Sequence, residues 1–454
     1  MHRPAVFLNR YSLFLAGLVV FSAVVRGLLI FSGFKLVQTD GQEYFDFSRQ
    51  FYQYLLQTDF QSAFSLPVLG HWGSIVLGAI PFALPLPGLS AEENSAVFFA
   101  LPSLVNIVLI YSIACGFNWH PRTACLSALL YALTVSNLYQ TRFVLLMDLS
   151  MMFFLLAFRT VQFAGSACPL RRFLAGLLCF ATFFTYYGYW MIAGWGLVYA
   201  SLSGAQSLRQ IVRFGLLAAI GFLLPMTAFF LLLHSFDVDW WQRLQWFSST
   251  AIQGDFVDGF LIPFEFLFLA EGALFLVFLI CIFFMVKRGL ATLLLWLWFP
   301  LIFIYALFVI GSNLLEYYVV LGRHVRQLTP FLCLLSAFVL VNLGEKKLAF
   351  VLAMVVSWFF YQYLHIYQSR FNLDETLTLE RLRQMPAYQG VEIQRIDSCL
   401  PARAECPQVP AECHVIDRFV WGMSYPVYQY DAMNRTARQN IRGTKLYSVF
   451  FVCP

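Results

Sequence analysis

The chain has 454 residues, of which 60% are hydrophobic and 12% are charged, and its mean hydropathy is +0.71. A soluble domain carries about 25% charged residues, so this composition excludes a soluble enzyme, a disordered chain and a nucleic-acid-binding protein. The formal charge of 29 − 24 = +5 is too small to indicate a polyanionic partner. Membrane lipid is therefore the expected environment of most of the chain.

Hydrophobic runs of 17–25 residues are candidates for membrane-spanning helices. The interval 66–87 is apolar enough to span, but it contains His71, four prolines and three glycines. If it only dips into the outer leaflet, every basic connection faces the cytoplasm, as the positive-inside rule requires. We therefore predict an all-α polytopic bundle of about eleven transmembrane helices, with a cytoplasmic N-terminus and an amphipathic first outward loop. The predicted spans are 11–33, 96–116, 123–140, 149–165, 173–186, 188–203, 214–233, 263–286, 291–311, 327–343 and 348–367. A single tilted helix over 173–203 is the alternative for the two short runs.

The last part of the sequence differs in composition from the rest. Residues 368–454 hold ten Lys/Arg and nine Asp/Glu, so 19 of the 53 charged residues lie in 87 positions. This predicts a membrane body over 1–367 and a small extracytoplasmic domain over 368–454. Four cysteines of this tail predict two disulfides with three alternative connectivities, because an outward domain is oxidised; a zinc site is the less favoured alternative. These cysteines are Cys399, Cys406, Cys413 and Cys453.

The first polar cluster follows the first span and includes Asp40, Glu43 and Tyr44. In a helix these residues and Phe47 would share one face at i, i+3, i+4 and i+7, which is typical of an amphipathic segment on the membrane surface. Asp40 and Glu43 also have the spacing of a capping box, so a purely structural role in starting that helix is the alternative.

The second polar cluster runs from Ser136 to Asp148 between two spans and includes Arg142. Arg142 and Asp148 are six residues apart, a poor separation for an ion pair within a helix, so each is free to face another group. Ionisable residues at membrane depth are functional candidates. The alternative is that Asp148 caps the next helix and Arg142 reaches the lipid headgroups.

The third polar cluster lies at the outward end of the tenth span and contains Arg323, His324 and Arg326, followed by Pro330. Cationic groups in an outward position break the positive-inside trend and call for an anion. A phosphate fits best, because its oxygens match the planar guanidinium fork. Contact with lipid headgroups is the alternative.

Several other polar and aromatic residues have structural interpretations. Arg26 and Glu271 are ionisable residues inside predicted spans, so they either pair within the bundle or line a pathway. His71 is expected to be a satisfied interfacial histidine. The aromatic group 186–190 and the pair Trp240 and Trp241 are predicted to be interfacial anchors.

The order and position of the three clusters resemble the GT-C superfamily of polytopic glycosyltransferases, especially the protein O-mannosyltransferases and the lipid A aminoarabinose transferases. These families carry an early outward acidic residue followed by an aromatic, as in Asp40-Gly-Gln-Glu43-Tyr44. They then show an arginine stretch leading to a second acidic residue, which Tyr139-Gln-Thr-Arg142 and Asp148 resemble, and a late arginine followed by proline, as in Arg326-Gln-Leu-Thr-Pro330. The first motif departs from the adjacent Asp-Glu pair that is common in them.

The resemblance implies transfer of a sugar from a polyprenyl-phosphate donor to a glycan, lipid or protein acceptor on the extracytoplasmic face. It implies Asp40 as general base, with Asp148 and Glu43 as further catalytic carboxylates. Tyr44, Arg142, Arg323, His324 and Arg326 would bind substrate. No cofactor is required by the sequence, although some family members use a divalent cation. A bacterial inner membrane with a periplasmic C-terminus is the expected location.

Two other functional classes compete with this prediction. A secondary transporter or lipid flippase would show inverted repeats with broken helices in matching halves. A non-catalytic membrane assembly subunit would depend on residues 368–454 and not on Asp40.

Overall fold

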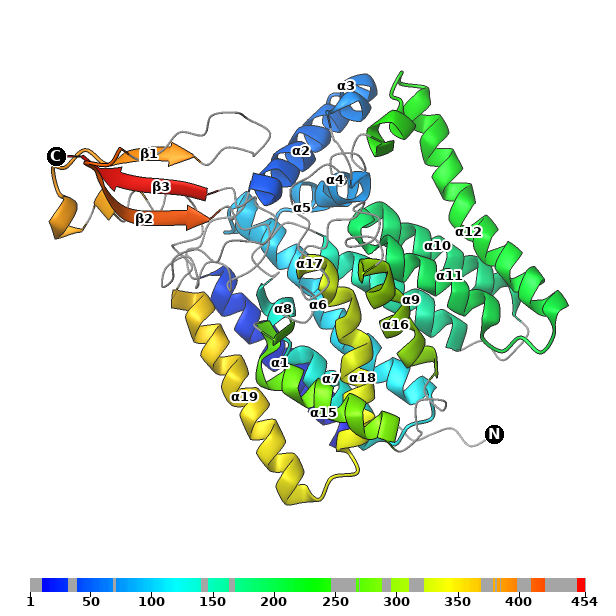
Figure 1. The fold of residues 1–454 in the computed structure, drawn as a ribbon. Coiled ribbons are helices and arrows are strands. Elements are labelled where there is room, and N and C mark those ends of the chain that lie inside the picture. Colours follow the sequence, from blue (N-terminus) through cyan, green and yellow to red (C-terminus); the bar gives the residue numbers. More distant parts are fainter. Residues whose placement is uncertain are drawn as a thin grey trace.

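The computed structural model describes most of the chain as a helical bundle (Figure 1). The described residues are 10–31, 39–67, 71–139, 146–162, 168–245, 267–268, 270–287, 295–309, 322–368, 379, 382–383, 385–397, 410–420 and 447–453. The helices before the middle of the chain are α1 (Arg10–Ile30), α2 (Thr39–Leu56), α3 (Phe60–Ser65), α4 (Trp72–Gly78), α5 (Ile80–Ala83), α6 (Ala91–Gly116), α7 (Pro121–Ala132), α8 (Val135–Tyr139) and α9 (Met147–Gln162). The later helices are α10 (Pro169–Thr185), η2 (Tyr187–Tyr189), α11 (Trp190–Leu202), α12 (Leu208–His234), α15 (Ala273–Lys287), α16 (Leu295–Val309), α17 (Gly322–Val325), η5 (Arg326–Leu328), α18 (Thr329–Leu340), α19 (Glu345–Gln368) and η7 (Pro386–Tyr388).

Over its described residues, each predicted hydrophobic interval contains a helix or a pair of consecutive helices. Among the described residues, four helices are long and apolar enough to cross a membrane, namely α1, α6, α12 and α19. The arrangement of eleven crossings and the orientation of the termini stay predictions. The alternative of one tilted helix over 173–203 is wrong, because η2 interrupts the chain and α10 packs against α11.

The core of the bundle forms around α9 and α10. Helix α9 packs against α6 and α10, and α10 packs against α12. Gly176 and Gly221 permit the contact between α10 and α12, because a Cβ at either position would collide with a backbone carbonyl of the facing helix. Small residues that allow close backbone approach are typical of helix contacts in membranes.

Several helices expose apolar side chains on the surface of the bundle. Helix α12 exposes Leu216, Ile220 and Leu224, and α1 exposes Val20 and Val24. A soluble protein rarely leaves large contiguous apolar patches in water. These helix faces are therefore suited to lipid.

The interval 66–87 is broken into two short helices, α4 and α5, over its described residues 66–67 and 71–87. His71 precedes α4 with a φ of 56°, which is a left-handed conformation. Helix α4 packs against α2. A helix of this length is too short to cross the hydrocarbon core of a bilayer.

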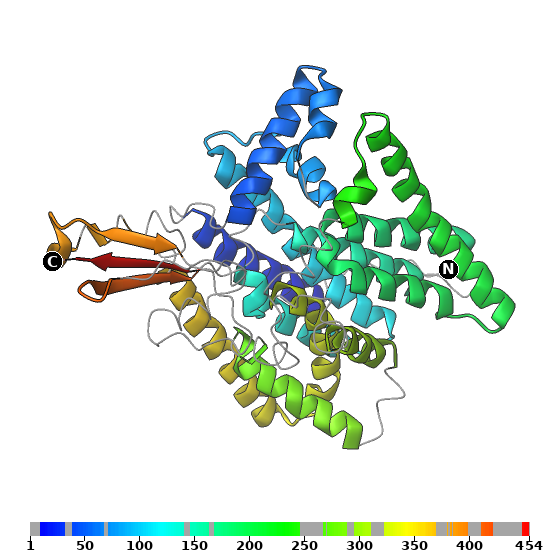
Figure 2. The ribbon, with the colours of Figure 1, turned by 45° about the horizontal axis from the view of Figure 1, so that its top comes forward.

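The tail contains a small sheet, so the prediction of an all-α chain is wrong for this part. The strands β1 (Gln394–Asp397), β2 (His414–Val420) and β3 (Tyr447–Val452) form an antiparallel sheet in the order β1-β3-β2. Figure 1 and Figure 2 both show the sheet set apart from the helices. Phe450 and Leu382 are buried at its centre. These strands were not predicted, and the domain boundary between residues 367 and 368 stays a prediction.

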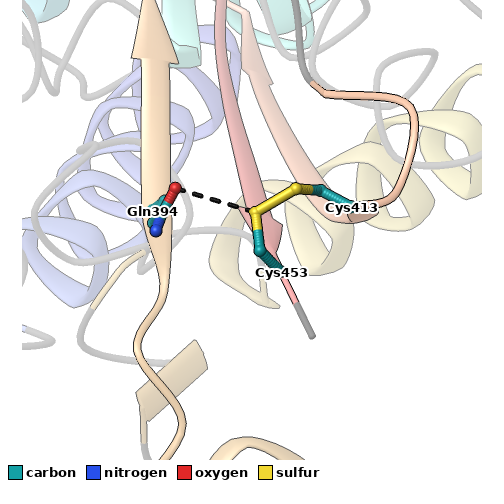
Figure 3. The surroundings of a disulfide bond; sticks show 3 residues. All are labelled: Gln394, Cys413 and Cys453. Carbon is teal, nitrogen blue, oxygen red and sulfur yellow. Dashed lines mark hydrogen bonds between the residues drawn. A yellow bond between two sulfur atoms is a disulfide. The ribbon is translucent and has the colours of Figure 1, made fainter.

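A disulfide joins Cys413, at the start of β2, to Cys453, just after β3 (Figure 3). The Cα atoms are 4.2 Å apart, and 40 residues separate the cysteines in sequence. One of the two predicted disulfides is therefore present, and it pairs Cys413 with Cys453. Cys399 and Cys406 lie outside the described residues.

Replacing Cys413 with serine is expected to destabilise the sheet by about 2–4 kcal/mol, because the open chain gains conformational freedom. Limited proteolysis of the tail in the detergent-solubilised protein measures this effect as faster cleavage between β1 and β3. Cys168→Ser is the control, since Cys168 forms no disulfide and lies at the start of α10. Equal cleavage rates in the Cys413 variant and the wild type would contradict the prediction.

Candidate functional site

A buried ion pair joins two of the predicted polar clusters. The Nη2 atom of Arg326 donates to Asp148 Oδ1 at 2.7 Å and to Asn137 Oδ1 at 2.7 Å. Asp148 lies in the first turn of α9, and Arg326 begins η5, 178 residues later. The exposed fractions of the two residues are 6% and 2%. A charge-assisted bond removed from water is stronger than a surface pair, so this contact fixes α9 to the segment 322–328.

Neighbouring side chains hold both partners of this ion pair in place. Asn106 of α6 donates to the backbone carbonyl of Asp148 at 2.9 Å. Buried Glu271 accepts bonds from the backbone amides of Val135 at 2.8 Å and Ser136 at 3.1 Å. Its carboxylate therefore caps the N-terminus of α8, the helix that carries Asn137. These bonds agree with the expectation that Glu271 pairs within the bundle. The hydrogen-bond donors to its carboxylate are backbone amides.

A row of aromatic and imidazole rings joins α2 to the third cluster. The ring centroids of Tyr44 and His71 are 5.6 Å apart, and His71 stacks on Tyr186 at 4.5 Å and 11°. The hydroxyl of Tyr186 lies 3.5 Å from Nε2 of buried His324. The four residues come from α2, the start of α4, the end of α10 and α17. The row therefore links α2 to the segment that carries His324 and Arg326.

Hydrogen bonds fix the orientation of His71 in this row. Its Nδ1 accepts the backbone N–H of Tyr187 at 2.9 Å, so Nδ1 carries no proton in this structure. The hydroxyl of Tyr187 accepts a bond from Trp240 Nε1 at 3.0 Å.

The aromatic group 186–190 was predicted as a set of interfacial anchors, and this is wrong for most of it. Tyr186, Tyr187, Tyr189 and Trp240 are buried, whereas only Trp190 and Trp241 among the predicted anchors described here are exposed. Gly188 allows the close packing, because a Cβ at this position would lie 2.5 Å from His324 Nε2. Tyrosine and tryptophan suit both burial and the interface, and composition alone does not separate the two.

One glutamine side chain positions the segment that carries His324 and Arg326. The amide of Gln327 donates to the carbonyls of Gly188 at 3.1 Å and His324 at 3.0 Å, and its oxygen accepts the amide of Ile192 at 3.2 Å. Gln327 is fully buried. The turn from α17 to α18 is therefore tied to the start of α11.

The structure connects four of the predicted site residues through the contacts above, namely Tyr44, Asp148, His324 and Arg326. The backbones of Asp40 and Glu43 lie in the first turns of α2, which confirms the predicted helix, but their side chains lie outside the described residues. The same holds for the side chain of Arg323 in α17, and Arg142 is outside the described residues altogether. His71, Tyr186 and Gln327, which were not predicted as site residues, also belong to this group of contacts.

A divalent cation would need several oxygen or nitrogen ligands close together. Within the described part of the chain, no group of three His, Cys, Asp or Glu side chains is arranged to hold a metal ion. The Asp148 carboxylate is engaged by a guanidinium.

Comparisons with known proteins give matches at the level of structure alone. No family model matches the sequence, and no curated protein does. The chain is similar to the oligosaccharyltransferase of Archaeoglobus fulgidus in its apo form, with 12% identity and a TM-score of 0.48, over 81% of this chain and 56% of that chain. It is similar to the same enzyme in complex with Zn and sulfate, with 14% identity and a TM-score of 0.46, over 78% and 53%.

A third match is the archaeal enzyme with an inhibitory peptide and a dolichol-phosphate, with 12% identity and a TM-score of 0.48, over 80% and 56%. This chain thus spans about half the length of the structures it matches.

Proposed function

We propose that this protein is a membrane glycosyltransferase that moves a sugar from a polyprenyl-phosphate donor to an acceptor on the extracytoplasmic face, in a bacterial inner membrane with a cytoplasmic N-terminus. The observation that supports the proposal is a buried ion pair between Asp148 and Arg326, which belong to polar segments far apart in sequence. A row of rings through His71 and Tyr186 links Tyr44, of the first polar segment, to His324 of the third.

An apolar bundle with a buried polar site suits a lipid-linked sugar donor. Its prenyl chain needs an apolar surface, which the exposed faces of the helices supply. Its phosphate needs cationic donors, and the guanidinium of Arg326 offers planar paired N–H groups for phosphate oxygens. Arg323, His324 and Arg142 are assigned to the same phosphate through the sequence motifs.

The proposed reaction is a single displacement at the anomeric carbon. Asp40 takes the proton of the acceptor hydroxyl or amine while that atom forms a bond to the anomeric carbon. The bond between the anomeric carbon and the phosphate oxygen breaks, and its electron pair leaves with the polyprenyl phosphate. The cationic groups stabilise the charge that develops on this leaving group, and the anomeric configuration inverts. Glu43 and Asp148 position the base and the acceptor.

A transfer assay on the purified protein in detergent tests this function. We expect wild-type protein, given a radiolabelled polyprenyl-phosphate sugar and native envelope extracts, to release polyprenyl phosphate and to label an acceptor. Heat-inactivated protein is the control. Donor that stays intact but crosses the bilayer of reconstituted vesicles would instead establish a flippase. Unchanged donor in both assays would favour a non-catalytic subunit.

A further inference from the structure

A second arginine lies buried beside the ion pair of Asp148 and Arg326, and the proposed mechanism gives it no role. Arg26 of α1 is 2% exposed, and its Nη1 donates to the backbone carbonyl of Ser22 at 3.2 Å. A guanidinium stays charged in proteins, and burial of a charge is costly unless an opposite charge compensates it. Arg26 therefore needs an anionic group close to it.

Asp148 is the carboxylate within electrostatic reach of Arg26, although the two do not form a direct ion pair within the described residues. Tyr131 and Arg326 also lie within that reach. The other buried carboxylate nearby, Glu271, is engaged by the amides of Val135 and Ser136. One carboxylate is therefore shared by two guanidiniums, and Arg326 holds the direct contact.

Hydrogen-bond donors remain unused around this carboxylate. The Nε of Arg26 and the hydroxyl of Tyr131 are buried, and neither has a hydrogen-bond partner among the residues that the structure describes. Tyr131 is 2% exposed and, like Arg26, lies within electrostatic reach of Asp148. Unsatisfied buried donors cost free energy, so their retention beside one carboxylate indicates a state in which they are used.

We propose that Arg26 is a positioning residue that compensates the charge of Asp148 when Arg326 turns to the phosphate of the donor. This inference rests on the proposed function. In the structure described here, Arg326 binds Asp148. When phosphate arrives, Arg326 exchanges one anion for the other, and Asp148 would be left as an uncompensated buried charge. Arg26, with the hydroxyl of Tyr131, compensates the charge of that carboxylate. The exchange therefore avoids the full free-energy cost of leaving a buried carboxylate unpaired.

The inference is tested by binding of a radiolabelled polyprenyl monophosphate, without sugar, to the full-length protein in detergent. We expect Arg26→Gln to weaken binding about tenfold, because Arg326 is then the main counter-ion of Asp148. Arg26→Lys keeps the charge and should stay within about threefold of wild type. Arg26→Gln combined with Asp148→Asn should also return to within about threefold, because no carboxylate competes with the phosphate. Arg10→Gln, at the exposed end of the same helix, is the matched control.

Restoration of binding by the second substitution separates this role from a structural one, because Asp148→Asn does not refill the space left by the arginine. Equal binding by wild type and Arg26→Gln would overturn the inference. So would a double variant as weak as the single variant. If Arg26→Gln does not fold, Arg26→Lys decides, and a tenfold loss there overturns the inference. Wild-type protein that binds no polyprenyl phosphate would instead overturn the proposed function.

Discussion

Replacing Asp40 with asparagine is expected to lower sugar transfer by about 10²–10⁴-fold, which is the usual contribution of a general base. The amide cannot accept the proton of the acceptor, although it keeps the size of the side chain. Binding of the donor should stay unchanged, because the phosphate is assigned to cationic residues of other segments. Transfer is measured as release of polyprenyl phosphate per enzyme, and donor binding is measured separately on the same preparation.

Asp46→Asn is the matched control for this variant, since Asp46 lies on the same helix in an ion pair with Arg49 at 3.4 Å. Such a surface pair contributes about 0–1 kcal/mol, so its loss should leave transfer intact. Glu43→Gln tests whether the carboxylate three residues later shares the role of the base. If Asp40→Asn turned over like wild type and only α2 became less stable, Asp40 would be a helix cap, and the transporter and assembly hypotheses would move ahead.

Replacing Arg326 with alanine should abolish measurable transfer and also destabilise the bundle. The variant leaves Asp148 buried without its direct partner, and breaking such a pair costs about 3–5 kcal/mol. We expect a value near the lower end of this range, because Arg26 remains within electrostatic reach of Asp148. Asn137 also loses the donor of its hydrogen bond. Thermal unfolding in detergent measures the stability, and the transfer assay measures the activity.

Two further variants separate these effects. Adding Asp148→Asn to Arg326→Ala removes the carboxylate that has lost its direct partner, so part of the stability should return while transfer stays absent. Arg122→Ala, at an exposed position of α7, should change neither quantity. Full activity in a destabilised Arg326→Ala variant would show that the arginine is structural alone, and the phosphate would then need another site.

The helical intervals of the bundle could be predicted from the sequence because hydropathy is a local property. The amphipathic helix that carries Asp40 and Tyr44 was predicted in the same way, from spacing alone. The contact of Asp148 with Arg326 could not be predicted, since 178 residues separate them and each has several partners of suitable charge. The six-residue separation argued against Arg142 as a within-helix partner of Asp148, and the structure supplies Arg326 as the partner instead.

The row from Tyr44 through His71 and Tyr186 to His324 was missed for a different physical reason. Aromatic residues and histidine near helix ends suit the lipid interface as well as a packed interior, and only the tertiary fold decides between the two. The three strands of the tail were also not predicted. Their pairing, in which β3 lies between β1 and β2, depends on contacts between distant residues.

The three hydrogen bonds of Gln327 have a thermodynamic consequence. They tie the backbone of His324 to Gly188 and Ile192, so the turn that bears both His324 and Arg326 is held as one body. A displacement of this turn therefore changes the free energy of two contacts together, that of His324 with Tyr186 and that of Arg326 with Asp148.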